Sequence, residues 1–291
     1  MADDAKAKAK KTEDELAGSE APLLDHLVEL RKRLIRSAIV LIVLLIGFFV
    51  VSKEILEFLI EPYRSVVPVP EDLRLIYTAP QELFFTQLNV AFFAALFVGF
   101  PYLAYEVYAF VAPGLYKKER HAFVPYLIAT PVFFFLGGLM VYYFVLPLAM
   151  GFFQSMQTDE IEMLVKVSEY LGLAMTLILA FGICFQLPVI LTLLAQIELV
   201  NSKQLARGRR YAVVGILVLA AFISPPDPFS QIGLALPVYA LYEVAILAVK
   251  FVERRRAARE AAEAAATGSV PDAANAKAAT DTPVPEPAKS K

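Results

Sequence analysis

The sequence contains no tryptophan, one cysteine and two histidines. A single cysteine cannot form an internal disulfide or a cysteine-based metal site. We therefore expect Cys184, which lies inside an apolar stretch, to be a small core residue. The histidines, His26 and His121, lie beside apolar stretches and not within them. These scarcities argue against a metal centre.

The chain also lacks the motifs of hydrolytic enzymes. It has no His-Glu-x-x-His, no Gly-x-Ser-x-Gly and no phosphate-binding loop that ends in Gly-Lys-Ser/Thr. A membrane enzyme still needs a nucleophile with a base, or a metal with its ligands, and neither set is visible. We therefore predict no catalytic residues, no metal, no cofactor and no enzymatic activity.

Charged residues are scarce within the apolar stretches, apart from Arg36, Glu106, Glu243 and Lys250 toward the ends of three of them. An ion-coupled transporter usually needs titratable or coordinating groups near mid-membrane. Their absence disfavours the alternative function, a secondary transporter for a small solute. The weak similarity between residues 101–106 and 237–243 would suit the internal repeats of such transporters.

Apolar sequence is abundant, since 58% of the 291 residues are hydrophobic. A membrane-spanning helix needs about 20 apolar residues, and a helical bundle in lipid can leave such side chains exposed. The composition therefore predicts an all-α integral membrane protein with six transmembrane helices. The six apolar stretches lie near residues 34–52, 83–109, 122–149, 170–196, 211–224 and 229–250.

Lysine and arginine are distributed unevenly around these stretches. They concentrate before the first stretch, between the second and third, between the fourth and fifth, and after the sixth. Basic residues favour the cytoplasmic side of a membrane. We therefore expect a multi-pass chain with both termini in the cytoplasm.

The fifth stretch is short, because about 14 residues of helix reach only about 21 Å. Either the last two helices cross a locally thinned membrane, which we favour, or the pair enters and leaves from the same side. Prolines interrupt four of the other helices and should bend them, which predicts a curved bundle. They are Pro101, Pro131, Pro188 and Pro237.

The chain divides into three regions by composition. Residues 1–20 read as a disordered cytoplasmic tail. Residues 21–252 read as the six-helix membrane domain, which opens with an amphipathic segment at the membrane interface. Residues 253–291 read as a basic helix end and a second disordered tail, rich in proline.

Three polar residues are candidates for function, and each also has a purely structural explanation. Gln186 lies near the membrane midplane, where its amide could bond a carbonyl freed by Pro188, or could line a wet cavity or a helix contact. Glu29 could pair with Lys32 or Arg33, one helical turn further on. Local pairing is likewise the simplest explanation for Glu119, which has basic neighbours.

Four blocks of sequence stand out along the chain. The first reads Phe-Val-Ala-Pro-Gly-Leu-Tyr-Lys-Lys-Glu-Arg at residues 110–120. The others are His-Leu-Val-Glu-Leu-Arg-Lys-Arg at 26–33, Phe-Gly to Gln-Leu-Pro at 181–188, and Ser-Pro-Pro-Asp-Pro-Phe-Ser-Gln at 224–231. Together these blocks resemble, in the same order, those of the TatC family, the polytopic signal-receptor subunits of the twin-arginine protein translocase. The resemblance covers about residues 22–252.

The resemblance implies a receptor in the bacterial inner membrane for Arg-Arg signal peptides, which exports folded proteins with TatA- and TatB-type single-helix partners, using the proton-motive force. It also implies contact with membrane lipids, homo-oligomers within a larger complex, and no nucleic acid. The signal-binding positions of the family match Glu29 and Glu119, with Arg31 and Phe110 as functional neighbours.

Two further positions of this chain match places that are functional in the family. Asp227 would act on the outer side of the membrane or cap a helix. Gln186 stands where relatives often carry glutamate, so a role there, including contact with a partner, must rest on hydrogen bonding.

Overall fold

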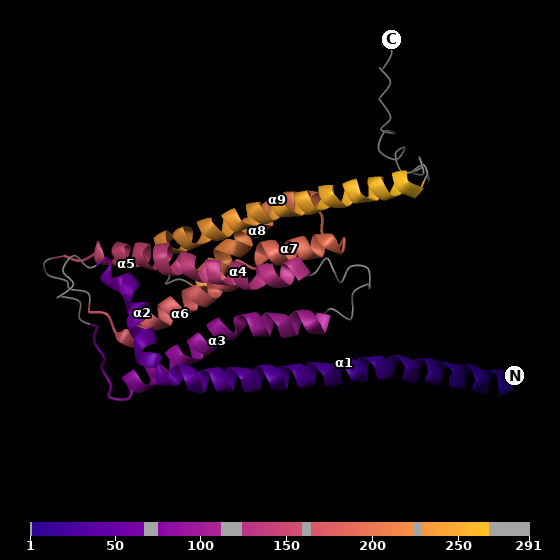
Figure 1. The fold of residues 1–291 in the computed structure, drawn as a ribbon, viewed down its shortest axis with the longest axis horizontal. Coiled ribbons are helices and arrows are strands. Elements are labelled where there is room, and N and C mark those ends of the chain that lie inside the picture. The colour runs from indigo at the N-terminus through magenta and orange to yellow at the C-terminus, as the bar shows by residue number, and fades with distance from the viewer. Residues whose placement is uncertain (1, 67–74, 112–123, 159–163, 224–227, 268–291) are drawn as a thin grey trace, which may run out of the picture.

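The computed structural model describes residues 2–66, 75–111, 124–158, 164–223 and 228–267 (Figure 1). None of these segments forms a β-strand, which confirms the all-α fold class. The helices are α1 (Ala2–Val50), α2 (Ser52–Arg64), α3 (Glu82–Val111), α4 (Val124–Met140), a π-helical turn η4 (Val141–Val145), α5 (Leu146–Gln154), α6 (Val167–Cys184), α7 (Leu187–Gln196), α8 (Ser202–Ile223) and α9 (Pro228–Thr267).

Five helical segments within the described residues are long and apolar enough to cross a membrane. They are His26–Val50, Glu82–Phe110, Pro125–Gln154, Val167–Gln196 and Gln231–Arg259. The short fifth stretch of the sequence lies in α8, whose first turns hold the basic residues Lys203, Arg207, Arg209 and Arg210. The chain is thus a helical membrane protein, and a sixth crossing by α8 stays a prediction.

The last two helices form an antiparallel hairpin. The backbone N–H and hydroxyl of Ser202 donate to Glu253, at 2.7 and 2.6 Å. At the other end of the hairpin, the Gln231 amide donates to the carbonyl oxygen of Leu217 at 3.0 Å. Helices α1 and α3 also run antiparallel, and the start of α1 and the end of α9 lie toward the same end of the bundle (Figure 1).

Prolines interrupt the helices as the sequence predicts. Pro101, Pro131 and Pro237 lie inside α3, α4 and α9, and α3 changes direction along its length (Figure 1). Pro188 lies in the first turn after the break between α6 and α7. Because proline supplies no backbone N–H, the helix interior loses a bond at Pro101, Pro131 and Pro237.

Helix α2 lies across the end of the bundle opposite the start of α1 (Figure 1). The hydroxyls of Tyr142 and Tyr170 donate to the carbonyl oxygens of Phe58 and Leu59, at 2.8 and 2.9 Å, and so fix α2 to η4 and α6. At the same end Glu82, the first residue of α3, accepts bonds from Thr78 and Ser168.

Helix α1 begins at Ala2, and the division of the chain into two tails and a membrane domain stays a prediction. Alanine, lysine and glutamate have high helix propensity, so a helix that starts inside the bundle can continue through this polar segment. The expected interfacial segment is continuous with the first span for the same reason. At the other terminus α9 continues to Thr267.

Candidate functional site

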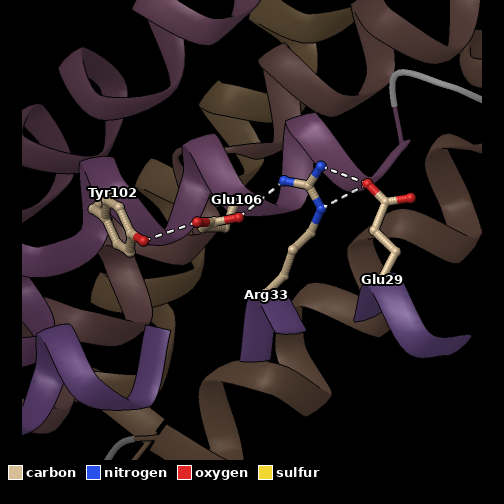
Figure 2. A network of polar contacts seen from close by, with 4 residues as sticks. All are labelled: Glu29, Arg33, Tyr102 and Glu106. Atoms are coloured by element: carbon tan, nitrogen blue, oxygen red, sulfur yellow. Dashed lines mark hydrogen bonds and ion pairs between the residues drawn. The ribbon is translucent and has the colours of Figure 1, made fainter. Parts of the chain in front are cut away.

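Glu29 lies on α1 near the end of the bundle from which that helix emerges. Arg33, one turn further along, donates to a single carboxylate oxygen of Glu29, Oε1, from Nε at 3.1 Å and from Nη2 at 2.6 Å (Figure 2). The other oxygen of Glu29 points away from Arg33 (Figure 2). The predicted local ion pair is therefore confirmed, with Arg33 as the partner.

The same guanidinium also joins α1 to α3. Its Nη1 lies 2.9 Å from Oε2 of Glu106, and the hydroxyl of Tyr102 donates to Oε1 of Glu106 at 2.8 Å (Figure 2). The side chain of Glu29 is 37% exposed, that of Arg33 20% and that of Glu106 7%. The four residues therefore form a polar chain from an accessible carboxylate to a buried one.

In the sequence, Glu106 stands out only as a charge toward the end of an apolar stretch. Two signals could have found its role. A carboxylate at membrane depth needs a cationic partner, and Tyr102 precedes it by four positions, the spacing of neighbours on one helix face. Which cation pairs with Glu106 depends on how α1 lies along α3, which the sequence does not specify.

Phe110 lies at the same end of the bundle, one turn beyond Glu106 on α3. Its ring stacks on that of His26, with centroids 4.1 Å apart and planes inclined by 17°. His26 precedes Glu29 by one turn of α1, so the structure brings Phe110 to the helix segment that carries Glu29. Arg31 is exposed and is two positions from Glu29, on a different face of α1 from the Glu29–Arg33 pair.

Two of the predicted site residues lie outside the described residues. Glu119 follows Phe110 by nine positions, in the segment 112–123. Asp227 belongs to the segment 224–227. Their roles stay predictions.

Gln186 occupies the break between α6 and α7 and is 7% exposed. Its amide nitrogen donates to the carbonyl oxygen of Thr130 on α4 at 3.0 Å, and to that of Gly182 at 3.5 Å. The carbonyl left free by Pro188 would be that of Cys184, four residues earlier, and it is not the acceptor of these bonds. Gln186 therefore links the break between α6 and α7 to α4, and its functional role stays a prediction.

A second polar set joins α8 to α9. Arg209 donates to both oxygens of Glu243, from Nε to Oε1 and from Nη2 to Oε2, each at 2.8 Å. The hydroxyl of Tyr239 donates to Oε1 of the same carboxylate at 2.9 Å. The hydrogen bond to Glu243 raises the pKa of Arg209. Both antiparallel helix pairs, α1 with α3 and α8 with α9, thus carry a Tyr–Glu–Arg set. Arg209 meets both carboxylate oxygens of Glu243, whereas Arg33 meets one oxygen of Glu106.

No group of three potential metal-binding His, Cys, Asp or Glu side chains occurs within the described part of the chain. The chemistry around Glu29 is instead the binding of a guanidinium by carboxylates, next to two stacked aromatic rings.

Comparison with known proteins gives a consistent result. The family model for the Sec-independent protein translocase protein (TatC) matches residues 25–237. The chain is 46% identical to the protein of that name from Magnetococcus marinus over 245 residues, 84% of this chain and 90% of the relative. It is 34% identical to the Escherichia coli K12 protein over 230 residues, 79% of this chain and 88% of the relative.

A solved structure agrees. The crystal structure of a twin-arginine translocase receptor, TatC, superimposes with a TM-score of 0.70 at 32% identity, and the match covers 78% of this chain and 99% of that one.

Proposed function

This chain belongs to the TatC family, the receptor subunits of the twin-arginine protein translocase, and we propose that it recognises paired arginines at a site built around Glu29 and Glu119. It is a component of protein transport in the bacterial inner membrane and not an enzyme. A secondary transporter of small solutes would belong to a different functional class, and the family of this chain argues against it.

One observation supports the arginine site above the others. The carboxylate of Glu29 already holds a guanidinium, that of Arg33, in a position where more than a third of the glutamate side chain is exposed. Arginine can make paired, charge-assisted bonds to a carboxylate, whereas lysine offers a single point charge. A second carboxylate at Glu119 would let the receptor hold both arginines of a signal.

Neighbouring residues would contribute the remaining affinity. Phe110 and His26 present stacked rings beside Glu29, to which a planar guanidinium or an apolar side chain of the signal can bind. Arg31 would help to set the charge of the site. Lys117, Lys118 and Arg120 surround Glu119 in the sequence and would repel a distant cation, so recognition depends on short-range geometry.

We also propose six crossings with both termini in the cytoplasm. The antiparallel hairpin of α8 and α9 supports an even number of crossings after α7, and the basic residues support the side. Cysteines introduced at residue 10 and at Glu57 test this topology, because a membrane-impermeant thiol reagent should label only Glu57→Cys from outside intact cells.

The chain acts with other subunits of the Tat complex, and we propose that these are TatA- and TatB-type single-helix proteins and further copies of this chain. Exposed apolar residues on α8, such as Val214, Val218 and Phe222, offer contacts for such helices or for lipid.

A partner contact at Gln186 would require the hydrogen bond between Gln186 and Thr130 to open. Asp227 would act on the outer side. The proton-motive force would drive transport.

An export assay tests the arginine site. The chain would be the only TatC in a cell that makes a folded reporter with an Arg-Arg signal or its Lys-Lys counterpart. We expect export of the first reporter alone, and we expect Glu29→Gln and Glu119→Gln to reduce it strongly. Glu57→Gln, an exposed carboxylate on α2, is the matched control.

Normal export by the two site variants, at equal protein levels, would refute the site. Equal export of both reporters by the unaltered chain would refute recognition of arginine.

A further inference from the structure

We propose that Arg33 occupies Glu29 as an internal substitute for a signal arginine, and that signal binding exchanges this contact while Arg33 stays on Glu106. The inference rests on the proposed function, because it concerns how the same carboxylate becomes available. It adds Arg33 and Glu106 to the site as residues that set its affinity.

The contacts of Arg33 are unequal in geometry. Both of its bonds to Glu29 converge on one oxygen, so the planar fork of the guanidinium does not meet both oxygens of that carboxylate. Arg209, in contrast, meets both oxygens of Glu243 at 2.8 Å. Two parallel bonds from one guanidinium to both oxygens of a carboxylate are stronger than two bonds to a single oxygen. Arg33 does not form such parallel bonds with Glu29, but an incoming arginine that approaches Glu29 from its open side could.

The burial of the two carboxylates decides which contact of Arg33 is exchanged. Glu106 is 7% exposed, and a buried carboxylate without a cation is strongly unfavourable, so Arg33 must remain with it. Glu29 is 37% exposed, and water or another cation can take the place of Arg33 there. In the network of Glu29, Arg33, Glu106 and Tyr102, the contact at the exposed Glu29 is therefore the exchangeable one. The contact at Glu106 and Tyr102 is fixed.

A competing internal ligand lowers the apparent affinity of a site by the fraction of molecules in which the site is open. This reduction is the same for every ligand of Glu29, so it lowers the affinity for arginine and lysine signals equally. Arg33 would thus set the affinity threshold of the receptor, while the geometry of the carboxylate sets its preference for arginine.

Two variants should change the affinity in opposite directions. In Arg33→Gln/Glu106→Gln the competitor is removed, no buried charge is left unpaired and the net charge is unchanged. We expect this variant to bind an Arg-Arg peptide about 1.5- to 5-fold more tightly, the range for losing a competing ion pair at an exposed carboxylate. In Glu106→Gln alone, Arg33 has only Glu29 as a partner, so we expect weaker binding.

The measurement uses the purified full-length chain in lipid nanodiscs and a fluorescent peptide that carries Arg-Arg and an apolar segment, titrated by anisotropy. The Lys-Lys peptide is titrated in parallel, and its ratio to Arg-Arg should stay constant across the variants. Arg209→Gln/Glu243→Gln removes the equivalent Tyr–Glu–Arg set from α8 and α9 and should bind as the unaltered chain does.

The outcomes separate this inference from the proposed function. If the unaltered chain binds both peptides alike, or Glu29→Gln binds normally, the arginine site itself is wrong. If that site holds but the double variant binds as the unaltered chain does, or more weakly, the exchange is wrong. Should the double variant not accumulate, Arg33→Lys keeps a cation for Glu106 without the fork. Tighter binding by Arg33→Lys would then support the exchange, and unchanged or weaker binding would overturn it.

Discussion

Gly137 makes the close approach of α4 and α6 possible, and its replacement gives a stringent test of the packing. A methyl group at residue 137 would lie 2.7 Å from the carbonyl oxygen of Phe181 and 3.0 Å from the ring of Phe185. Ordinary contacts begin at 3.4 Å, so the two helices would have to separate by about 0.7 Å. Because the nearest obstacle is backbone, it cannot rotate away.

We expect Gly137→Ala to lower the free energy of unfolding by roughly 1–3 kcal/mol, the cost of overpacking a well-filled interior. For a domain of this size the melting temperature would fall by roughly 2–12 °C. The chain lacks tryptophan, so unfolding of the purified protein in detergent is best followed by far-ultraviolet circular dichroism.

Gly172→Ala on α6 is the matched control, because a methyl group there meets nothing within 4 Å. It should leave the melting temperature unchanged or raise it, since alanine favours the helix. If Gly137→Ala melts at the same temperature as Gly172→Ala, the close contact of α4 with α6 is wrong.

Three further changes test the interior. Tyr170→Phe removes the bond to the carbonyl of Leu59 and should cost about 1 kcal/mol, seen as faster hydrogen exchange in α2; unchanged exchange would argue against this attachment. Gln186→Leu removes the hydrogen bond to the carbonyl of Thr130 and should lower the free energy of unfolding by about 1 kcal/mol. An unaltered melting curve would argue against this hydrogen bond. Cys184 is buried and should react with a maleimide only after denaturation, so rapid labelling of the native protein would contradict its burial.

The candidate site could be predicted in part. The pairing of Glu29 with Arg33 follows from a spacing of four residues on one helix, which brings side chains together in any fold. Glu106 is 73 positions from Arg33, and its pairing depends on the rotation and register of α3 against α1. Sequence spacing contains no such information, so the buried half of the site was missed.

Gln186 shows the same limit. Its depth in the membrane and the neighbouring proline were visible in the sequence and indicated a hydrogen bond. The acceptor is the carbonyl of Thr130, on a helix 56 positions away, and only the packing of α4 against the break between α6 and α7 identifies it.

The sequence by itself determined the class of the molecule, because long apolar runs and clustered basic residues act through solvation, which depends on composition and not on contacts. It also contained the blocks that place the chain in its family. The tertiary structure decided which charge lies beside which. The pairing of two carboxylates with one arginine depends on the angle, rotation and register of two helices, and many side-chain contacts along their length set these together.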